Sequence, residues 1–282
     1  MPFAGEITRA DIVARIEAHS LGDTPGAMRQ AFARLVNGDG PPAPPPGVRV
    51  SCDETLVVQP DDTDPDRPPV VWFHGGGYVF GSPETHLRPA YHLARHHGMT
   101  VLLPRYRLAP EHPWPAQLDD AHRALDVHPA PIVAGDSAGG HLALVAASER
   151  PVAALLLFSP NTDRTGRSPT RKGLGPFDPM VDDAGDARLA AMCFGDRPGD
   201  DPQVSPTLGD LSRMPPTYLE VGSPEVLLGD AALLGAAADR QGATVKTVVT
   251  PGLLHMGQLW APWWAEARAS LDRAARFARR VT

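Results

Sequence analysis

After the first 47 residues, short apolar runs alternate with stretches that show helical spacing. The predicted strands are residues 55–58, 70–73, 100–103, 132–134, 153–158, 217–221 and 245–249. The predicted helices between and after them are residues 87–97, 116–125, 138–148, 227–241 and 262–281. Several of the runs are apolar throughout, which is typical of strands buried on both faces. This alternation predicts an α/β fold with a mostly parallel sheet flanked by helices.

Two segments depart from the alternation. Residues 1–40 predict two short helices, the first capped by Thr8 and the second beginning at Thr24-Pro25, followed by the proline-rich linker 41–47. Residues 160–213 are rich in Pro, Gly, Asp and Arg and predict only one modest helix, over 184–194. A long insertion between sheet strands is more often functional than idle, so we expect it to form a lid or a pocket wall.

Composition narrows the class of protein. The chain has 282 residues and a formal net charge of −7 with no dominant basic patch, so nucleic acid is not an expected partner. Its two cysteines, Cys52 and Cys193, fit a reducing compartment. Residues 1–6 show no secretory signal, and the longest apolar run, 152–158, is far shorter than the roughly 20 residues of a membrane span. We expect a cytoplasmic protein.

The strongest motif is Gly135-Asp136-Ser137-Ala138-Gly139, which matches G-x-S-x-G. A predicted strand precedes it and a predicted helix follows it, which is the context that a nucleophile elbow requires. The small residues at positions 135 and 139 allow the strand and the helix to approach closely. Ser137 is therefore predicted to lie at the tip of a tight turn with its hydroxyl accessible, as a catalytic nucleophile.

A glycine-rich segment and one histidine complete a candidate active site. His74-Gly75-Gly76-Gly77-Tyr78 follows the predicted strand 70–73, and its uncovered N–H groups suit an oxyanion; it matches neither common phosphate-loop pattern. His255 follows the last predicted strand, the place expected for a general base. His92 and His96 lie four residues apart on a predicted helix, but no third ligand is evident, so a solvated helix face is favoured and no metal is expected.

Four motifs together resemble the hormone-sensitive-lipase-like family of α/β-hydrolases, in its bacterial carboxylesterase branch. They are His74–Gly77, Tyr106–Pro113, Gly135–Gly140 and Ser159-Pro160, within a match of about residues 70–260. The resemblance implies a single domain over residues 1–282, with a helical cap built from residues 1–40 and about 160–213. It also implies carboxylic-ester hydrolysis without a cofactor. The implied oxyanion donors are the N–H groups of Gly76, Gly77 and Ala138, supported by His74, Gly75 and Asp136.

The chain differs from the usual sequence of the family where the acidic partner of His255 is expected. An aspartate followed by Pro-Leu is expected after the strand 217–221, but the chain has Gly222-Ser223-Pro224-Glu225. Alignment on the following leucines favours Glu225 as the acid. Asp163, after the preceding strand, is the second candidate. Asp230, one helical turn onward, is the third and is expected to be a helix-surface residue.

Three functions fit these motifs. The favoured one is a serine carboxylesterase that hydrolyses esters with short or medium acyl chains through an acyl-enzyme, with Ser137, His255 and Glu225 as the triad. A biosynthetic acyltransferase, an amidase or a lactonase would use the same triad on a specific metabolite. A non-catalytic ligand-binding protein on a hydrolase scaffold is disfavoured, because such a protein typically loses the serine or the histidine. A homodimer remains open.

Overall fold

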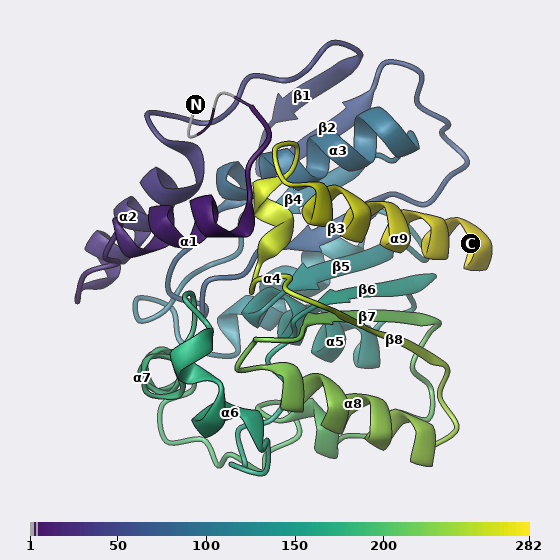
Figure 1. Ribbon diagram of the computed structural model, residues 1–282. Helices are drawn as coiled ribbons and strands as arrows, with labels where there is room; N and C mark the ends of the chain where they lie inside the picture. Colours follow the sequence, from purple (N-terminus) through teal and green to yellow (C-terminus); the bar gives the residue numbers. More distant parts are fainter. Residues whose placement is uncertain (1–2, 4) are drawn as a thin grey trace.

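The computed structural model describes residue 3 and residues 5–282, so part of the segment 1–6 that was inspected for a signal lies outside the described residues. Eight strands form one sheet in the order β1-β2-β4-β3-β5-β6-β7-β8 (Figure 1). The pairs β1–β2 and β2–β4 are antiparallel and all the others are parallel. Their bounds are β1 Val48–Cys52, β2 Thr55–Pro60, β3 Val70–Phe73, β4 Val101–Pro104, β5 Ile132–Asp136, β6 Ala154–Phe158, β7 Thr217–Gly222 and β8 Val245–Thr250.

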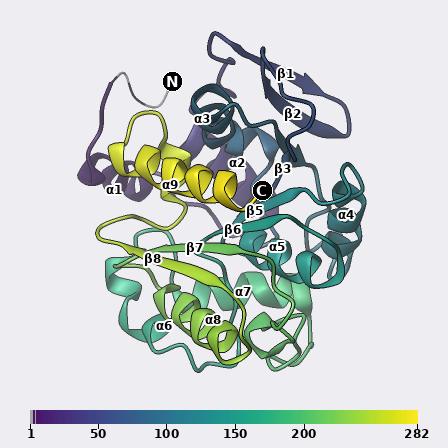
Figure 2. The same ribbon diagram turned by 90° about the vertical axis from the view of Figure 1, so that its right-hand side faces the viewer.

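Helices cover both faces of the sheet (Figure 2). The helices α3 (Leu87–His97) and α9 (Ala265–Val281) pack together on one face. The other face carries α4 (Ala116–Leu125), α5 (Ala138–Glu149) and α8 (Leu228–Arg240). Every residue of β3 through β7 is buried, as the continuous apolar runs indicated. The prediction of a mostly parallel sheet flanked by helices is confirmed.

One strand escaped the sequence analysis. The strand β1 pairs antiparallel with β2 at the edge of the sheet, and only its first residue, Val48, is buried. Its sequence, Val48-Arg49-Val50-Ser51-Cys52, alternates apolar and polar residues, which is a strand signal. The sequence analysis relied on continuous apolar runs and therefore passed over this short alternation.

The two irregular segments lie at the same end of the sheet. The helices α1 (Arg9–Glu17) and α2 (Pro25–Asn37) stand beside α6 (Thr170–Gly173) and α7 (Asp183–Phe194) there (Figure 1). Thr8 caps α1 in a capping box with Asp11, as the spacing predicted. The short helix α6 adds to the single helix predicted for residues 160–213. The 3₁₀ turns are η1 Pro83–His86, η2 Gly175–Phe177, η3 Pro206–Leu208 and η4 Gly257–Trp260.

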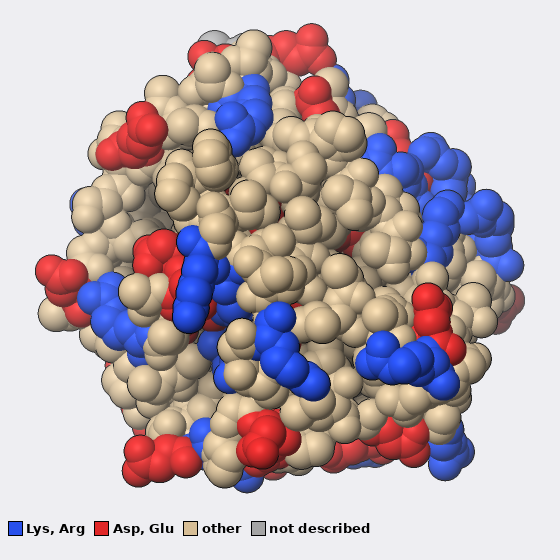
Figure 3. Space-filling model, turned by 60° about the horizontal axis from the view of Figure 1, so that its bottom comes forward, with Lys and Arg blue, Asp and Glu red and all other residues tan. Residues whose placement is uncertain are grey.

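Charged side chains of both signs are interspersed on the face that Figure 3 shows. The upper centre of this view is uncharged, several blue groups lie together at its right edge, and blue and red groups are mixed across its lower half. Within residue 3 and residues 5–282, no helix has the length and apolar character needed to cross a membrane.

Candidate active site

Ser137 occupies a strained turn between β5 and α5. Its φ is +54°, in the region that residues with a side chain rarely adopt. A Cβ at Gly135 would lie 2.2 Å from the carbonyl oxygen of Gly139, and one at Gly139 would lie 2.0 Å from the carbonyl oxygen of Phe73. Both approaches are too close for any side chain. The glycines of the motif therefore permit the sharp turn that presents Ser137, as predicted for a nucleophile elbow.

His255 and Glu225 form a buried hydrogen-bonded pair. Glu225 follows β7 and His255 follows β8, so the carboxyl ends of two neighbouring parallel strands bring them together. Glu225 Oε2 lies 2.9 Å from His255 Nδ1, and each side chain is only 1% exposed. The other carboxylate oxygen, Oε1, accepts hydrogen bonds from Ser159 Oγ at 2.9 Å and from the N–H of Gly222 at 2.5 Å. The carboxylate is thus held in one orientation.

Burial and pairing shift the pKa values of this pair. Burial by itself lowers the pKa of His255, but the hydrogen bond and the negative charge of Glu225 outweigh it, so the pKa of His255 is raised. Burial also raises the pKa of Glu225, and the hydrogen bond from His255 offsets this only in part. The arrangement favours an imidazolium at His255 more than an isolated buried histidine would.

The other two candidate acids lie elsewhere. Asp163 accepts hydrogen bonds from the Thr165 hydroxyl and from two backbone N–H groups of its own loop. Asp230 is fully buried, and its carboxylate pairs with Arg171 at 2.8 Å. The expectation that Asp230 is a helix-surface residue is therefore wrong, because Arg171, 59 residues earlier in the chain, provides a buried partner. Of the three candidates, the structure places Glu225 at His255.

The glycine-rich segment lies beside the elbow. Gly76 and Gly77 have φ values of +118° and +59°, which a glycine adopts readily. In the described part of the chain, the N–H groups of Gly76, Gly77 and Ala138 donate to no protein acceptor. Gly76 and Gly77 line the cavity that contains Ser137, and Ala138 is the residue that follows Ser137 in the chain. The three N–H groups are available to an incoming oxygen.

Three of the supporting residues that were named from the resemblance hold this segment in place. Asp136 accepts hydrogen bonds from Trp72 Nε1 at 2.8 Å and from the N–H of Gly75 at 3.1 Å. The His74 ring stacks on Tyr106 with ring centroids 4.2 Å apart, and its Nδ1 bonds to the carbonyl of Gly75 at 2.9 Å. The start of the glycine segment is therefore fixed to the strand that precedes Ser137.

A cavity of about 400 Å³ joins these groups. Ser137 and His255 both line it, and His255 Nε2 is buried with no partner among the described residues, so no hydrogen bond links the two side chains in this structure. The rest of the wall comes from both irregular segments and from the glycine segment. These residues include Ile16, Leu21, Met28, Leu35, Phe80, Met180, Val181 and Leu189. Polar and charged side chains of the same two segments also line it, namely His19, Ser20, Asp23, Asp182, Asp186 and Arg188, so the wall is mixed.

The sequence analysis did not predict two side-chain contacts at the site. Ser159 was noted only as part of a motif, yet its hydroxyl binds the Glu225 carboxylate. Tyr78, next to Gly77, places its hydroxyl 2.5 Å from Nδ1 of His141 on α5. The place of Ser159, directly after a parallel strand, was a usable signal because such strand ends meet at one edge of the sheet. The Tyr78–His141 contact had no such signal.

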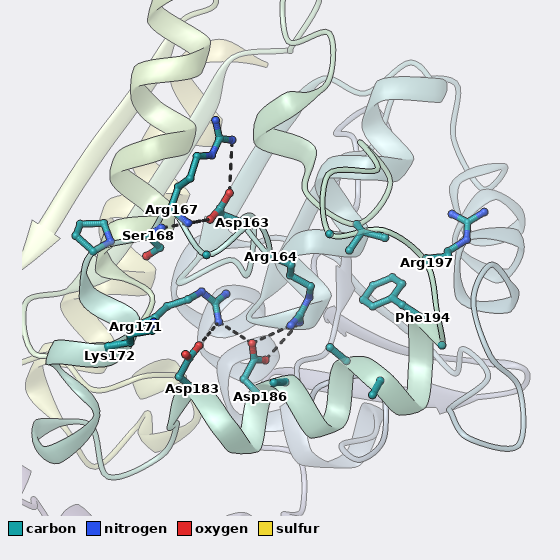
Figure 4. Close-up of a pocket in the computed structure, with 18 residues that line it drawn as sticks. Asp163, Arg164, Arg167, Ser168, Arg171, Lys172, Asp183, Asp186, Phe194 and Arg197 are labelled. Carbon is teal, nitrogen blue, oxygen red and sulfur yellow. Dashed lines mark hydrogen bonds and ion pairs between the residues drawn. The ribbon is translucent and has the colours of Figure 1, made fainter.

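A second cavity of about 570 Å³ lies behind α7 (Figure 4). Figure 4 shows Arg171 and Arg164 both directed at Asp186, at 2.7 Å and 2.9 Å. Asp186 lines this cavity and the one that contains Ser137. The helix α7 is therefore a shared wall, fastened from behind by buried ion pairs.

Comparisons with known proteins agree with this geometry. The family model described as "alpha/beta hydrolase fold" matches residues 70–259. An acetyl-hydrolase of Streptomyces hygroscopicus is 31% identical over 267 residues, which cover 90% of this chain and 89% of the relative. An esterase of Acinetobacter venetianus is 33% identical over 223 residues, 74% of each chain.

Solved structures extend the likeness to the whole chain. An esterase from the bacterial hormone-sensitive lipase family superposes with a TM-score of 0.88 at 27% identity, covering 99% of both chains. The structure of EstE5 soaked with p-nitrophenyl butyrate gives a TM-score of 0.86 at 26% identity, covering 96% of this chain and 97% of that one. The chain belongs to the α/β-hydrolase family, in the branch of the bacterial hormone-sensitive-lipase-type esterases.

Proposed function

We propose that the chain is a serine carboxylesterase in which Ser137 attacks the acyl carbon of an ester while His255 takes the hydroxyl proton. Glu225 orients His255 and stabilises the imidazolium that forms. The N–H groups of Gly76, Gly77 and Ala138 bind the oxyanion of the tetrahedral intermediate. His255 then gives the proton to the leaving alcohol, and an acyl-enzyme remains. Water attacks this ester, with His255 again as the base, and releases the carboxylic acid.

One observation carries the proposal. Ser137 and His255, which is paired with Glu225, line one cavity beside three N–H groups that bind nothing else in the described part of the chain. A nucleophile, an oriented base and oxyanion donors are the set that acyl transfer requires. A scaffold that only binds a ligand has no need of the paired Glu225 or of the strained φ at Ser137.

The test is chemical labelling combined with turnover. A fluorophosphonate should modify Ser137 alone, located by peptide mass, and Ser137→Ala should lower kcat by about 10⁶, by analogy with serine proteases. Ser148→Ala is the matched control, because Ser148 is an exposed serine on the same helix, α5, and should leave both readouts unchanged. Full esterase activity in a folded Ser137→Ala protein would disprove the mechanism. Release of free acid with water as the only acceptor distinguishes hydrolysis from obligatory acyl transfer.

The cavity also supports a substrate class. Its volume of about 400 Å³ and the apolar side chains in its wall suit esters with short or medium acyl chains. In a series of p-nitrophenyl esters, kcat/KM should be highest at short to medium chain lengths and fall for long chains. A maximum at long acyl chains would contradict this assignment and would leave the triad unaffected.

The proposal also covers the cap, the lack of a cofactor and the cellular location. Segments 1–40 and about 160–213 act as one cap, since residues of both line the catalytic cavity. Catalysis needs no cofactor, because the triad and the N–H groups supply the nucleophile, the base and the charge stabilisation. The free thiols of Cys52 and Cys193 favour a reducing, cytoplasmic location. Fractionation of the native host would test that location.

A further inference from the structure

A cluster of two histidines and an aspartate lies outside the catalytic cavity, between α3 and α9. Nε2 of His92 and Nε2 of His97 lie 2.8 Å and 2.7 Å from the same oxygen, Oδ1 of Asp272. One atom from each residue lies within 4.8 Å of the other two. The expectation of a solvated face is therefore wrong for His92, which is buried, although His96 is exposed. The third group missed by the sequence analysis is 180 residues away in the chain.

We propose that His92, His97 and Asp272 form a binding site for a divalent transition-metal ion, with zinc as the best-suited ion. Two imidazoles and one carboxylate are ligand types that zinc binds in a tetrahedral arrangement, with a fourth position open to solvent. Calcium and magnesium prefer sets of oxygen ligands, so this mixed set disfavours them.

Two of the three distances between ligand atoms are slightly shorter than in a zinc site, and the third, between the two Nε2 atoms, is at most 4.8 Å. Ligand atoms about 2.0–2.1 Å from a tetrahedral zinc ion are about 3.4 Å from one another. The two nitrogen–oxygen distances would therefore open by roughly half an ångström, which a small rotation of the Asp272 carboxylate supplies. The ligands stand on two packed helices, and Arg279 of α9 also binds the carbonyl of His97. Rigid elements of this kind favour a defined coordination geometry.

The protonation pattern permits ligation. Nδ1 of His92 and Nδ1 of His97 are both buried and have no partner among the described residues. Without an ion, Asp272 Oδ1 accepts the Nε2–H hydrogen bonds of both rings, so the Nε2 protons must leave before a metal binds. Because no donor occupies Nδ1, each ring can take its proton there and present the Nε2 lone pair to a metal.

Exposure provides an entry path. The side chains of His92 and His97 are 6% and 10% exposed, whereas that of Asp272 is 34% exposed. The carboxylate thus forms the solvent side of the cluster, where an ion can arrive and keep one water molecule. A bound ion would link α9, the helix that follows the His255 loop, to α3.

The experiment is a metal titration of the full chain after treatment with a chelator and its removal. Calorimetry with zinc chloride should show one high-affinity ion per chain, and cobalt(II) should give the visible absorption of a four-coordinate ion. Zinc should also raise Tm in proportion to the logarithm of its concentration above Kd. Circular dichroism and esterase activity of each variant establish that it has folded.

Three variants should weaken zinc binding at least tenfold: His92→Gln, His97→Gln and Asp272→Asn. Asp272→Asn is the sharpest, because an amide oxygen still accepts both histidine N–H groups but is a poor zinc ligand. His96→Gln is the matched control, since His96 lies on the same helix with its ring 4.7 Å from that of His92 and is not one of the three ligands. Unchanged affinity in Asp272→Asn, or equal loss in His96→Gln, would overturn the proposal. So would the absence of stoichiometric zinc binding, which would leave the cluster as a hydrogen-bonded link between helices and the esterase proposal untouched.

Discussion

At the scale of single residues, the pairing of Glu225 with His255 determines the pH range of activity. His255 acts as a base only when its ring is neutral, and its pKa is raised because the charge of Glu225 outweighs the effect of burial. As the pH falls through this raised pKa, the neutral fraction falls and kcat falls with it. The acid limb of the pH profile therefore reports on the Glu225–His255 pair.

Glu225→Gln should lower kcat by about 10² to 10³, less than the roughly 10⁴ of the analogous change in a serine protease. The amide removes the charge of Glu225, which contributes most to raising the pKa of His255, so burial is opposed only by the more weakly acting Asp178 and Asp136 and the acid limb should move to lower pH. Both effects are measured in one kcat profile against pH. Circular dichroism checks the fold.

Asp163→Asn and Asp230→Asn are the controls for this assignment. Each should keep most of kcat, and Asp230→Asn should also lower Tm, because the buried Arg171 loses a charged partner. If Asp163→Asn lost most of kcat while Glu225→Gln kept it, the acid would come from the loop after β6.

The sequence identified the residues of the candidate triad, but it did not show which of the other polar residues are buried. Ser137 and His255 follow predicted strands, and parallel strands bring their carboxyl ends to one edge, so their neighbourhood was foreseeable. Glu225 was favoured over Asp163 and Asp230 by alignment on the leucines that follow it, despite its extra methylene group. Asp230 and His92 were misjudged as exposed because each is buried by a partner far away in the chain, Arg171 or Asp272. The spacing of residues within one helix does not show which distant residues will pack against it.

At the scale of elements, the oxyanion groups come from two separate pieces of structure. Gly76 and Gly77 belong to the segment after β3, whereas Ala138 begins α5. The contact between Tyr78 and His141 joins these pieces directly. The His141 ring is neutral, because burial lowers its pKa to about 3. We therefore expect this neutral hydrogen bond, together with that from Gly75 to Asp136, to set the spacing of the proposed oxyanion donors.

Tyr78→Phe should lower kcat by up to about 10², the effect expected when catalytic groups shift by about 1 Å, with little change in KM. It should also reduce the free energy of unfolding by about 1–3 kcal/mol, since Nδ1 of His141 would remain buried without a partner. Tyr91→Phe is a matched control, because the Tyr91 hydroxyl bonds to the carbonyl of Pro42, away from the catalytic cavity. A Tyr78→Phe enzyme with unchanged kcat would show that the two pieces are held by other contacts.

Buried charge fastens the helix α7 to the domain. Arg171 pairs with Asp186 on α7 (Figure 4). It also pairs with Asp230 on α8, and its side chain is almost fully buried. Arg171→Met should therefore lower the free energy of unfolding by about 3–5 kcal/mol, because two buried carboxylates lose a partner. Chemical denaturation measures this, and Arg197→Met, at a half-exposed ion pair, should change it by less than about 1 kcal/mol. Equal effects from the two variants would contradict an anchoring role for Arg171.

Element boundaries were the more predictable part of the fold. The helices α3 and α4 begin and end at the residues that the apolar spacing indicated, and α1 begins after its predicted cap at Thr8. Apolar spacing and helix caps depend only on residues close together in the chain, so they can be recognised from the sequence alone. The strand β1 was missed although its five residues alternate apolar and polar, because it has no continuous apolar run and buries only Val48.

At the scale of the whole molecule, the catalytic cavity is enclosed by segments from opposite parts of the chain. The helix α2 packs on the domain through Phe32, whose ring centroid lies 5.0 Å from that of Phe80. Arg29 of α2 also bonds to the carbonyls of Val79 and Ala109. The N-terminal helices therefore complete the cavity wall and brace the segment that follows the oxyanion glycines.

Removal of residues 1–40 should consequently affect substrate binding more than the sheet. We expect KM to rise for all esters, most for those with longer acyl chains, because Met28 and Leu35 line the cavity. The truncated protein should also aggregate, since Phe80 and its neighbours would be left as an exposed apolar patch. Asp23→Asn provides a folded comparison: it removes an exposed ion pair, Asp23 to Arg188 at 3.5 Å, that joins the two cap segments, and should raise KM only slightly. If the truncated chain stayed soluble with the same KM for every ester, α1 and α2 would not act as a cap, and the cavity residues from 179–189 would set the substrate range without them.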